Sequence, residues 1–328
     1  MAYAGGAGTA VNEARALPDC VVVVTPRSFG LSRPDLRRRL ASAVGTVRYR
    51  PGPLGAAELA AEVREADGLL CGLDQVSAEV FDEAPRLRVV ARYGVGTDRV
   101  DLSAAARHGV TVTVTPGANA NSVAELTVAL LFVLARPLVE GHDRARQGQW
   151  PALSGIELSG RSLGLVGLGR IGSLVAAKAN ALGMRVLAFD PNVTSAENVE
   201  LVELGPLVTE SDFVSLHAPL TEGTAKMVDR ALLERMKPGA ALVNTARGAL
   251  IDEDALLWAL DEGPLRAAAL DVLTDEPPGG AHPLLGRDDV FVTPHMGPHT
   301  AEATAAMGEM ALDDLLAVLA GRSPRYPL

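Results

Sequence analysis

Cysteine is almost absent from this sequence, and so are long runs of apolar residues or of basic residues. Only two of the 328 residues are cysteines, Cys20 and Cys71, and each lies in a short apolar run. Two widely separated thiols form neither a disulfide framework nor a metal site, so we expect both to be buried and no metal to bind. No apolar run approaches the ~20 residues that a membrane-spanning helix needs.

Positive charge is also scarce. Lysine and arginine number 30 against 40 acidic residues, the net charge is −10, and no polybasic run occurs. This balance argues against nucleic acid or an anionic membrane as a partner, although local arginines can still bind a small anion. Residues 1–18 are rich in alanine and glycine and lack the basic and apolar regions of a signal peptide. We expect a disordered tail and, by default, a cytoplasmic protein.

Short apolar runs alternate with helical stretches along the chain, which has enough residues for about two domains. The runs predict strands at 21–24, 68–71, 87–91, 110–115, 162–166, 185–189, 213–216, 241–244, 267–271 and 290–293. Such alternation is typical of parallel α/β layers. The predicted fold class is therefore α/β, with two Rossmann-like or flavodoxin-like domains, doubly wound parallel sheets and a cleft between them.

The clearest motif is the stretch Gly167-Leu-Gly169-Arg-Ile-Gly172 between a predicted strand and a helix. Gly167 permits a tight turn, Gly169 lets a pyrophosphate approach the backbone, and Gly172 lets the helix pack on the strand. Asp190 follows at the end of the next strand, where an acid binds a ribose 2′-hydroxyl. An acid there repels a 2′-phosphate, and Pro191-Asn192 offers no arginine to bind one. The motif therefore predicts NAD rather than NADP.

These signals divide the chain. Residues 19–117 together with 297–328 form a predicted substrate-binding domain, and residues 118–296 a predicted NAD-binding domain. A capping box of Ser122 and Glu125 is expected to open an almost wholly apolar helix that ends at Ala135. A helix that is apolar all round is buried on all sides, here against its own domain and against a partner subunit.

Three chemically active residues follow predicted strands of the second domain: Arg247, Glu276 and His295. The carboxyl ends of parallel strands meet at one edge, where ligands bind. A histidine can exchange a proton near neutral pH, a glutamate can hold its ring, and an arginine can bind a carboxylate. Each also fits a structural role when taken singly. Together, beside a dinucleotide loop, they predict the catalytic set of a hydride transfer. Asp271 fits two roles, a hydrogen bond to the nicotinamide carboxamide or a pairing with a neighbouring residue. His217 is expected to line the adenosine end of the cofactor.

The chain resembles the D-isomer-specific 2-hydroxyacid dehydrogenases over nearly its whole length after residue 18. The shared motifs are Arg92 to Asp98, Asn119 to Glu125, the glycine loop, Asn244 to Gly248, Asp271 to Pro277 and Thr293 to Gly297. The resemblance implies that His295 is the acid/base, Glu276 its partner and Arg247 the substrate anchor. It also implies a homodimer through the helix 122–135.

The same resemblance assigns the remaining site residues. The expected cofactor-binding residues are Gly167, Gly169, Arg170, Ile171, Gly172, Asp190, His217, Ala218, Pro219, Thr224, Thr245 and Asp271. The expected substrate-binding residues are Arg92, the backbone N–H groups of Val95 and Gly96, and Asn119.

The motifs look most like those of phosphoglycerate dehydrogenases that lack a regulatory domain, in which Arg92 can meet a phosphate and Arg136 can reach across the dimer. Both arginines also fit a surface role. The predicted substrate is therefore 3-phosphoglycerate. The pair Pro298-His299 departs from this resemblance, because small residues are expected after Gly297. The alternatives are a hydroxypyruvate or glyoxylate reductase and, from another class, an NAD(H)-sensing protein that binds a partner. The intact set of Arg247, Glu276 and His295 favours an enzyme.

Overall fold

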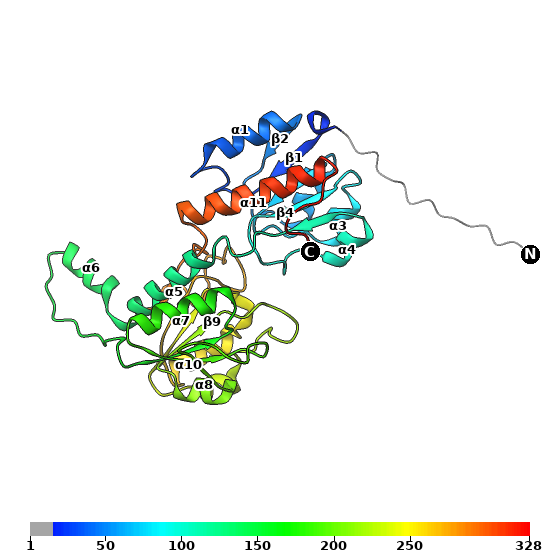
Figure 1. Cartoon of the computed structure of the whole chain (residues 1–328). Coiled ribbons are helices and arrows are strands. Elements are labelled where there is room, and N and C mark those ends of the chain that lie inside the picture. The colour runs from blue at the N-terminus through cyan, green and yellow to red at the C-terminus, as the bar shows by residue number, and fades with distance from the viewer. Residues whose placement is uncertain (1–15) are drawn as a thin grey trace, which may run out of the picture. The chain divides into compact units, whose positions relative to one another are not determined.

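Two parallel sheets carry the apolar runs of the sequence, each within its own compact unit. The computed structural model describes residues 16–328. One unit contains the described residues up to Ala118 and then Thr304–Leu328, and the other contains Asn119–Ala303 (Figure 1). The sequence placed the return crossing at 297, seven residues earlier than it occurs.

The first unit has a five-stranded sheet in the order β2-β1-β3-β4-β5, with every neighbouring pair parallel. This is the flavodoxin-like order. Its strands are β1 (Val21–Val24), β2 (Thr46–Tyr49), β3 (Gly68–Cys71), β4 (Val89–Arg92) and β5 (Thr111–Thr113). Its helices are α1 (Pro34–Ala43), α2 (Ala56–Val63), α3 (Ala78–Asp82), α4 (Leu102–Arg107) and most of α11 (Ala301–Leu319). Helix α11 packs into one core cluster with α1 and β1, which confirms that the last helix recrosses to this unit.

The second unit has a seven-stranded parallel sheet in the order β12-β11-β10-β9-β6-β7-β8. This is the Rossmann order, in which the direction of winding reverses between β6 and β9. The strands are β6 (Ser162–Val166), β7 (Arg185–Phe189), β8 (Glu200–Leu201), β9 (Phe213–Leu216), β10 (Ala240–Asn244), β11 (Leu265–Leu270) and β12 (Val290–Val292). The helices are α5 (Ala120–Ala135), α6 (Leu138–Arg146), α7 (Arg170–Ala181), α8 (Leu204–Glu210), α9 (Arg230–Glu234) and α10 (Glu253–Asp261). Separate apolar clusters cover the two faces of the sheet.

Two local predictions are wrong. Most of the expected tail, residues 1–15, lies outside the described residues, but Leu17–Asp19 forms the short 3-10 helix η1, closed by the Cys20 N–H donating to the Leu17 carbonyl. The capping box of Ser122 and Glu125 does not form, because α5 starts two residues earlier, at Ala120. The Ser122 hydroxyl instead donates to the Gly297 carbonyl, and the Glu125 carboxylate accepts from Asn121 Nδ2 at 2.8 Å.

Helix α5 is buried on one side only. Nine of its 16 residues are buried, whereas Glu125, Ala129 and Phe132 form an exposed stripe. After a sharp turn, α6 and the following loop stand away from the body of this unit (Figure 1). The Ile156 N–H closes the base of this arm (residues 137–155) by donating to the Ala135 carbonyl at 2.8 Å.

Within residues 16–328 no single helix is both long and apolar enough to cross a membrane. The α5–α6 pair reaches the required length and apolarity only when taken together across its 69° bend.

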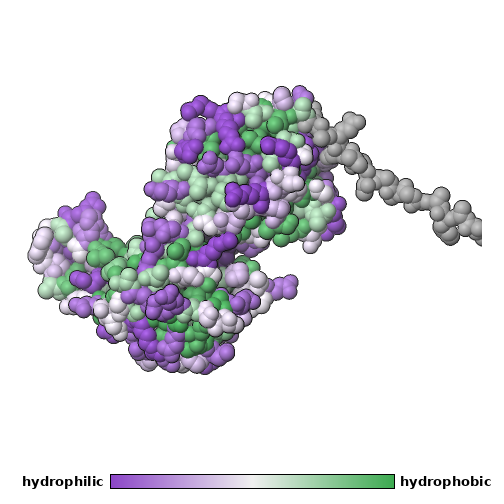
Figure 2. Space-filling view, in the orientation of Figure 1, coloured by the Kyte–Doolittle hydropathy of each residue, from purple (hydrophilic) through white to green (hydrophobic). Residues whose placement is uncertain are grey.

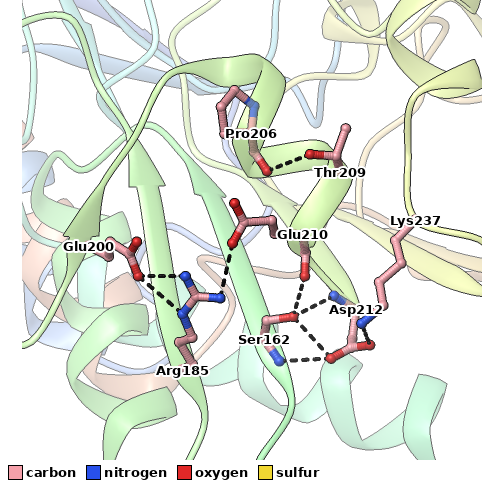
Figure 3. A network of polar contacts seen from close by, with 8 residues as sticks. All are labelled: Ser162, Arg185, Glu200, Pro206, Thr209, Glu210, Asp212 and Lys237. Atoms are coloured by element: carbon pink, nitrogen blue, oxygen red, sulfur yellow. Dashed lines mark hydrogen bonds and ion pairs between the residues drawn. The ribbon is translucent and has the colours of Figure 1, made fainter.

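A polar network joins the amino ends of the strands in the second unit (Figure 3). The Asp212 carboxylate accepts from the Ser162 N–H at 2.9 Å and from Lys237 Nζ at 2.7 Å. Arg185 bridges Glu200 and Glu210 at 2.7 and 3.1 Å. The chemistry predicted from the sequence follows the carboxyl ends of these strands, so this network at the other end is structural.

Candidate active site

The glycine loop lies where the sheet of the second unit reverses its winding, directly after β6. Gly167 has a φ of +100°, which favours glycine, and an added Cβ would lie 2.7 Å from the His217 carbonyl carbon at the end of β9. A Cβ at Gly172 would lie 2.2 Å from the Gly167 carbonyl oxygen. The turn therefore requires glycine at both Gly167 and Gly172. Gly169, in contrast, has nothing within 4 Å of the position of a Cβ.

This loop fits a dinucleotide phosphate. Open space over Gly169 leaves the backbone accessible, and helix α7 begins at the next residue. In the described part of the chain, the N–H groups of Arg170 and Ile171 have no hydrogen-bond acceptor. Unpaired N–H groups at a helix start favour an anion. A pyrophosphate would therefore be held by the first turn of α7.

Asp190 stands at the end of β7 and contacts the loop directly. Its Oδ2 accepts from the Leu168 N–H at 2.8 Å, and its Oδ1 accepts from the Asn192 N–H at 2.9 Å. Each carboxylate oxygen retains a further lone pair for a ribose hydroxyl. The side chain therefore supports the glycine loop in addition to any contact with a ligand, a role that the sequence did not suggest.

The other expected cofactor residues are fixed by neighbouring groups. His217 Nε2 lies 3.0 Å from Ser215 Oγ, and loss of solvation lowers the pKa of His217 to about 4. Thr224 Oγ1 donates to the Pro219 carbonyl at 2.7 Å, which closes the turn after Ala218. Thr245 is buried, with its hydroxyl 3.0 Å from that of Thr127 on α5.

The arginine loop follows β10 and is shaped by Asn244. Asn244 Oδ1 accepts from the Ala246 N–H at 3.0 Å and its Nδ2 donates to the Arg247 carbonyl at 2.8 Å. Gly248 then opens the 3-10 helix η2 (Gly248–Leu250), and an added Cβ there would lie 2.0 Å from the Leu273 carbonyl carbon. The backbone carrying Arg247 is therefore in contact with the loop that carries Glu276.

Glu276 and His295 form the direct contact that the sequence predicted. His295 Nδ1 lies 2.7 Å from Glu276 Oε2, and both side chains are largely buried. The second glutamate oxygen, Oε1, accepts from the Leu273 N–H at 3.1 Å. One ring nitrogen of His295 is thus held by a fixed carboxylate, which leaves Nε2 for a ligand.

His295 has a left-handed backbone with a φ of +51°, an unusual conformation for a non-glycine residue. Asp271, 1% exposed, holds the loop in this shape. Its Oδ1 accepts from the Met296 N–H at 2.8 Å and from Thr293 Oγ1 at 2.6 Å, and its Oδ2 accepts from the Gly297 N–H at 2.8 Å. Burial raises the pKa of Asp271 in spite of these hydrogen bonds. Asp271 thus makes local hydrogen bonds of the kind that the sequence allowed, and its contact with the nicotinamide carboxamide stays a prediction.

In the first unit, Arg92 ends β4 and is only 3% exposed. Its Nε donates to the Gly96 carbonyl at 2.9 Å, so the guanidinium supports the loop that follows. Val95 is 45% exposed, and among the described residues the N–H groups of Val95 and Gly96 have no acceptor. The loop thus offers two adjacent donors to an anion. Asn119 is half-buried at the start of α5, and its side chain makes no capping bond.

Sequence reasoning missed Ser122, Thr127 and Thr293 as contributors to this region. Ser122 and Thr127 are two of the four polar residues on the largely apolar helix α5, and that contrast is the signal that could have singled them out. Thr293 immediately precedes the Pro294-His295 pair, and its contact with Asp271 depends on pairing between β11 and β12. No group of three or more His, Cys, Asp and Glu residues suited to a metal occurs within residues 16–328.

A Rossmann sheet, a glycine loop at its reversal point and a carboxylate-held histidine at the same edge define a class, the NAD-dependent oxidoreductases. Comparison with known proteins narrows the class. Residues 128–297 match the family model "D-isomer specific 2-hydroxyacid dehydrogenase, NAD binding domain".

Relatives with known names support the same family. The chain is 42% identical to a glyoxylate reductase of Thermofilum pendens over 81% of this chain and 82% of that protein. It is 40% identical to a D-3-phosphoglycerate dehydrogenase of Methanocaldococcus jannaschii over 86% of this chain, but only 55% of that longer protein. The crystal structure of the TT0316 protein from Thermus thermophilus has a TM-score of 0.85 at 42% identity, covering 94% of this chain and 99% of that one.

The chain therefore belongs to the D-isomer-specific 2-hydroxyacid dehydrogenases, which are NAD-dependent enzymes. The family, the α/β fold, the enzyme class and the NAD cofactor predicted from the sequence are confirmed.

Proposed function

We propose that this enzyme transfers a hydride between NAD and a short, unphosphorylated D-2-hydroxy acid or its 2-keto form, with glyoxylate and hydroxypyruvate as the first candidates. The burial of Arg92 carries the choice of an unphosphorylated acid. This arginine was the cation expected to meet a phosphate, yet it is 3% exposed and donates to the carbonyl of its own loop. The high coverage of the glyoxylate reductase relative supports the same choice.

His295 serves as the acid/base. Because its Nδ1–H donates to the Glu276 carboxylate, its Nε2 carries the lone pair that accepts the proton of the substrate hydroxyl. The carboxylate then stabilises the imidazolium and keeps the ring oriented. In the reverse direction His295 returns this proton to the carbonyl oxygen of the keto acid. Bound NAD supplies the acceptor or donor of the hydride.

Arg247 anchors the substrate, since a guanidinium can donate two parallel hydrogen bonds to a carboxylate or polarise a carbonyl. The Val95 and Gly96 N–H groups donate to the substrate carboxylate, and Asn119 contributes a polar side chain. Gly167, Gly169, Arg170, Ile171 and Gly172 hold the pyrophosphate, Asp190 the adenosine ribose. Two further parts of the chain border the rest of the cofactor: the segment 217–224, and Thr245.

The second candidate substrate is 3-phosphoglycerate, which the sequence motifs favoured. One observation supports it: Arg92 Nη1 is buried and has no hydrogen-bond partner in the described chain. A rearrangement of the loop 93–98 would be needed to bring this nitrogen to a phosphate. Because burial of an unpaired donor is unfavourable, such a rearrangement has a driving force.

The enzyme also acts as a homodimer in this proposal, with the exposed stripe of α5 and the arm forming the interface. Trp150 is 91% exposed, and Leu138, Val139 and Leu153 on the same arm are also exposed. Hydrophobic residues gather where the arm meets the body of the unit (Figure 2). Exposed aromatic and aliphatic side chains of this kind are typical of protein interfaces.

A panel of acids tests the substrate assignment. Glyoxylate, hydroxypyruvate, pyruvate and 3-phosphohydroxypyruvate are each supplied with NADH, and NADH absorbance is followed at several concentrations. We expect the highest kcat/KM with an unphosphorylated acid. A preference for 3-phosphohydroxypyruvate would reject this choice and support the second candidate, and absence of turnover with every acid would reject catalysis.

A further inference from the structure

Helix α5 contacts the histidine loop through one buried hydroxyl. Ser122 is the third residue of α5 and is 7% exposed. Its Oγ donates to the carbonyl of Gly297, two residues after His295. Gly297 is itself buried, and a Cβ there would lie 3.2 Å from Val123 Cγ2 on the same helix. The first turn of α5 thus packs directly against the end of the loop.

The peptide groups around Gly297 are held from two elements at once. Asp271, after β11, accepts from the Gly297 N–H at 2.8 Å, whereas Ser122 on α5 donates to the Gly297 carbonyl. The left-handed backbone of His295 is costly and persists only where its surroundings fix it. Without the Ser122 hydroxyl, the buried Gly297 carbonyl loses its donor, and this destabilises the present conformation of the loop.

We propose that Ser122 is a positioning residue for His295: its hydrogen bond to Gly297 keeps the imidazole where it exchanges a proton with the substrate. This inference rests on the proposed role of His295 as the acid/base. Ser122 acts through the loop and lies on a different element from the glycine loop after β6. Its removal therefore slows the chemical step and leaves cofactor binding unchanged.

The test replaces Ser122 by alanine and uses Ser162→Ala as a matched control. Both serines are 7% exposed. Ser162 Oγ donates to the Glu210 carbonyl at 2.7 Å, at the amino ends of the strands. Three quantities are measured for each variant: kcat with the best acid, the Kd of NADH by fluorescence, and hydrogen exchange of the peptide 294–299 by mass spectrometry.

For Ser122→Ala we expect kcat to fall roughly tenfold, since small displacements of a catalytic group are costly. The Kd of NADH stays within about twofold, because the substitution leaves the cofactor-binding residues unchanged. The peptide 294–299 exchanges faster. Ser162→Ala changes neither kcat nor that exchange. If Ser122→Ala fails to fold, Ser122→Cys keeps the shape with a weaker donor and must shift kcat and exchange in the same direction.

Unchanged kcat and unchanged exchange in Ser122→Ala would overturn the proposal, as would an equal effect of Ser162→Ala. Failure of the proposed function looks different, because the unmodified protein would then turn over no acid. The exchange of 294–299 still decides in that case whether Ser122 holds the loop.

Discussion

Two histidines follow strands of the Rossmann unit, and their surroundings separate their roles. Loss of solvation holds the pKa of His217 at about 4, so His217 stays neutral at physiological pH and is not suited to exchange protons there. His295 Nδ1 instead lies 2.7 Å from Glu276 Oε2, which orients the ring and leaves Nε2 for a ligand. These surroundings favour His295 over His217 for the proposed acid/base role and agree with the proposal that His217 borders the cofactor.

At the residue scale, we propose that Asp190 determines the choice between NAD and NADP. A double substitution, Asp190→Ala with Asn192→Arg, removes the repelling carboxylate and adds a cation for a 2′-phosphate. We expect the ratio of kcat/KM for NAD to that for NADP to fall by roughly tenfold or more, which is about 1.4 kcal/mol. Steady-state assays with both cofactors give this ratio.

Asp190→Asn is the control for this experiment, because it keeps an oxygen that can accept from the Leu168 N–H. It separates loss of charge from loss of support for the glycine loop. If the unmodified enzyme already uses NADP as well as NAD, the role assigned to Asp190 is wrong.

Much of the site could be predicted from residue types at strand ends. His295, Glu276 and Arg247 follow short apolar strands, and parallel pairing of β10, β11 and β12 brings their loops to one edge. The contacts that support these residues could not be predicted. Ser122 reaches a carbonyl 175 residues away, and the buried position of Arg92 depends on the loop that folds over it. Such contacts arise from tertiary packing and leave no local pattern.

At the scale of elements, prediction succeeded where strands are buried on both faces. The strand β6, for example, is fully buried and has the expected bounds. The missed strands β2 and β8 lie at the edges of their sheets and are partly exposed, so neither has a continuous apolar run. Two short helices have weak sequence signals: α6 has no buried residue that would produce an apolar face, and α8 has only seven residues.

The network at the amino ends of the strands gives a prediction for stability (Figure 3). Burial disfavours the charged form of Asp212, but hydrogen bonds from Lys237 and Ser162 outweigh burial and lower its pKa. A carboxyl with a lowered pKa in the folded state stabilises above its unfolded pKa, and this contribution is lost as the pH falls through the folded value. The network therefore weakens in acid.

We expect Asp212→Asn to lower the free energy of unfolding by about 1–2 kcal/mol at pH 7. The difference from the unmodified protein should shrink below about pH 4, as Asp212 itself becomes protonated. Urea unfolding at pH 7 and at lower pH measures both quantities. A difference that stays constant with pH would show that the charge of Asp212 contributes nothing.

At the scale of the whole molecule, the exposed arm connects the fold to assembly. Trp150 is almost fully exposed within one chain, although it is among the largest apolar side chains. Tryptophans of this kind are often the residues that contribute most to an interface. The proposed homodimer would remove this surface from water.

Trp150→Ser should weaken the dimer by at least about 2 kcal/mol, or roughly 30-fold in Kd. Light scattering after gel filtration over a dilution series measures this constant. Leu31→Ser is the matched control, because Leu31 is a 66% exposed apolar residue outside the arm. A monomeric unmodified protein, or an equal effect of Leu31→Ser, would contradict the proposed interface.

The most direct test of the central claim is the turnover of His295→Ala with the best acid and NADH, compared with the unmodified enzyme. Loss of a general acid/base lowers kcat by roughly 10²–10⁴. We expect a loss of this size, while the Kd of NADH stays unchanged because the glycine loop is untouched. A kcat close to that of the unmodified enzyme would contradict the assignment of His295 as the acid/base and, with it, the proposed mechanism.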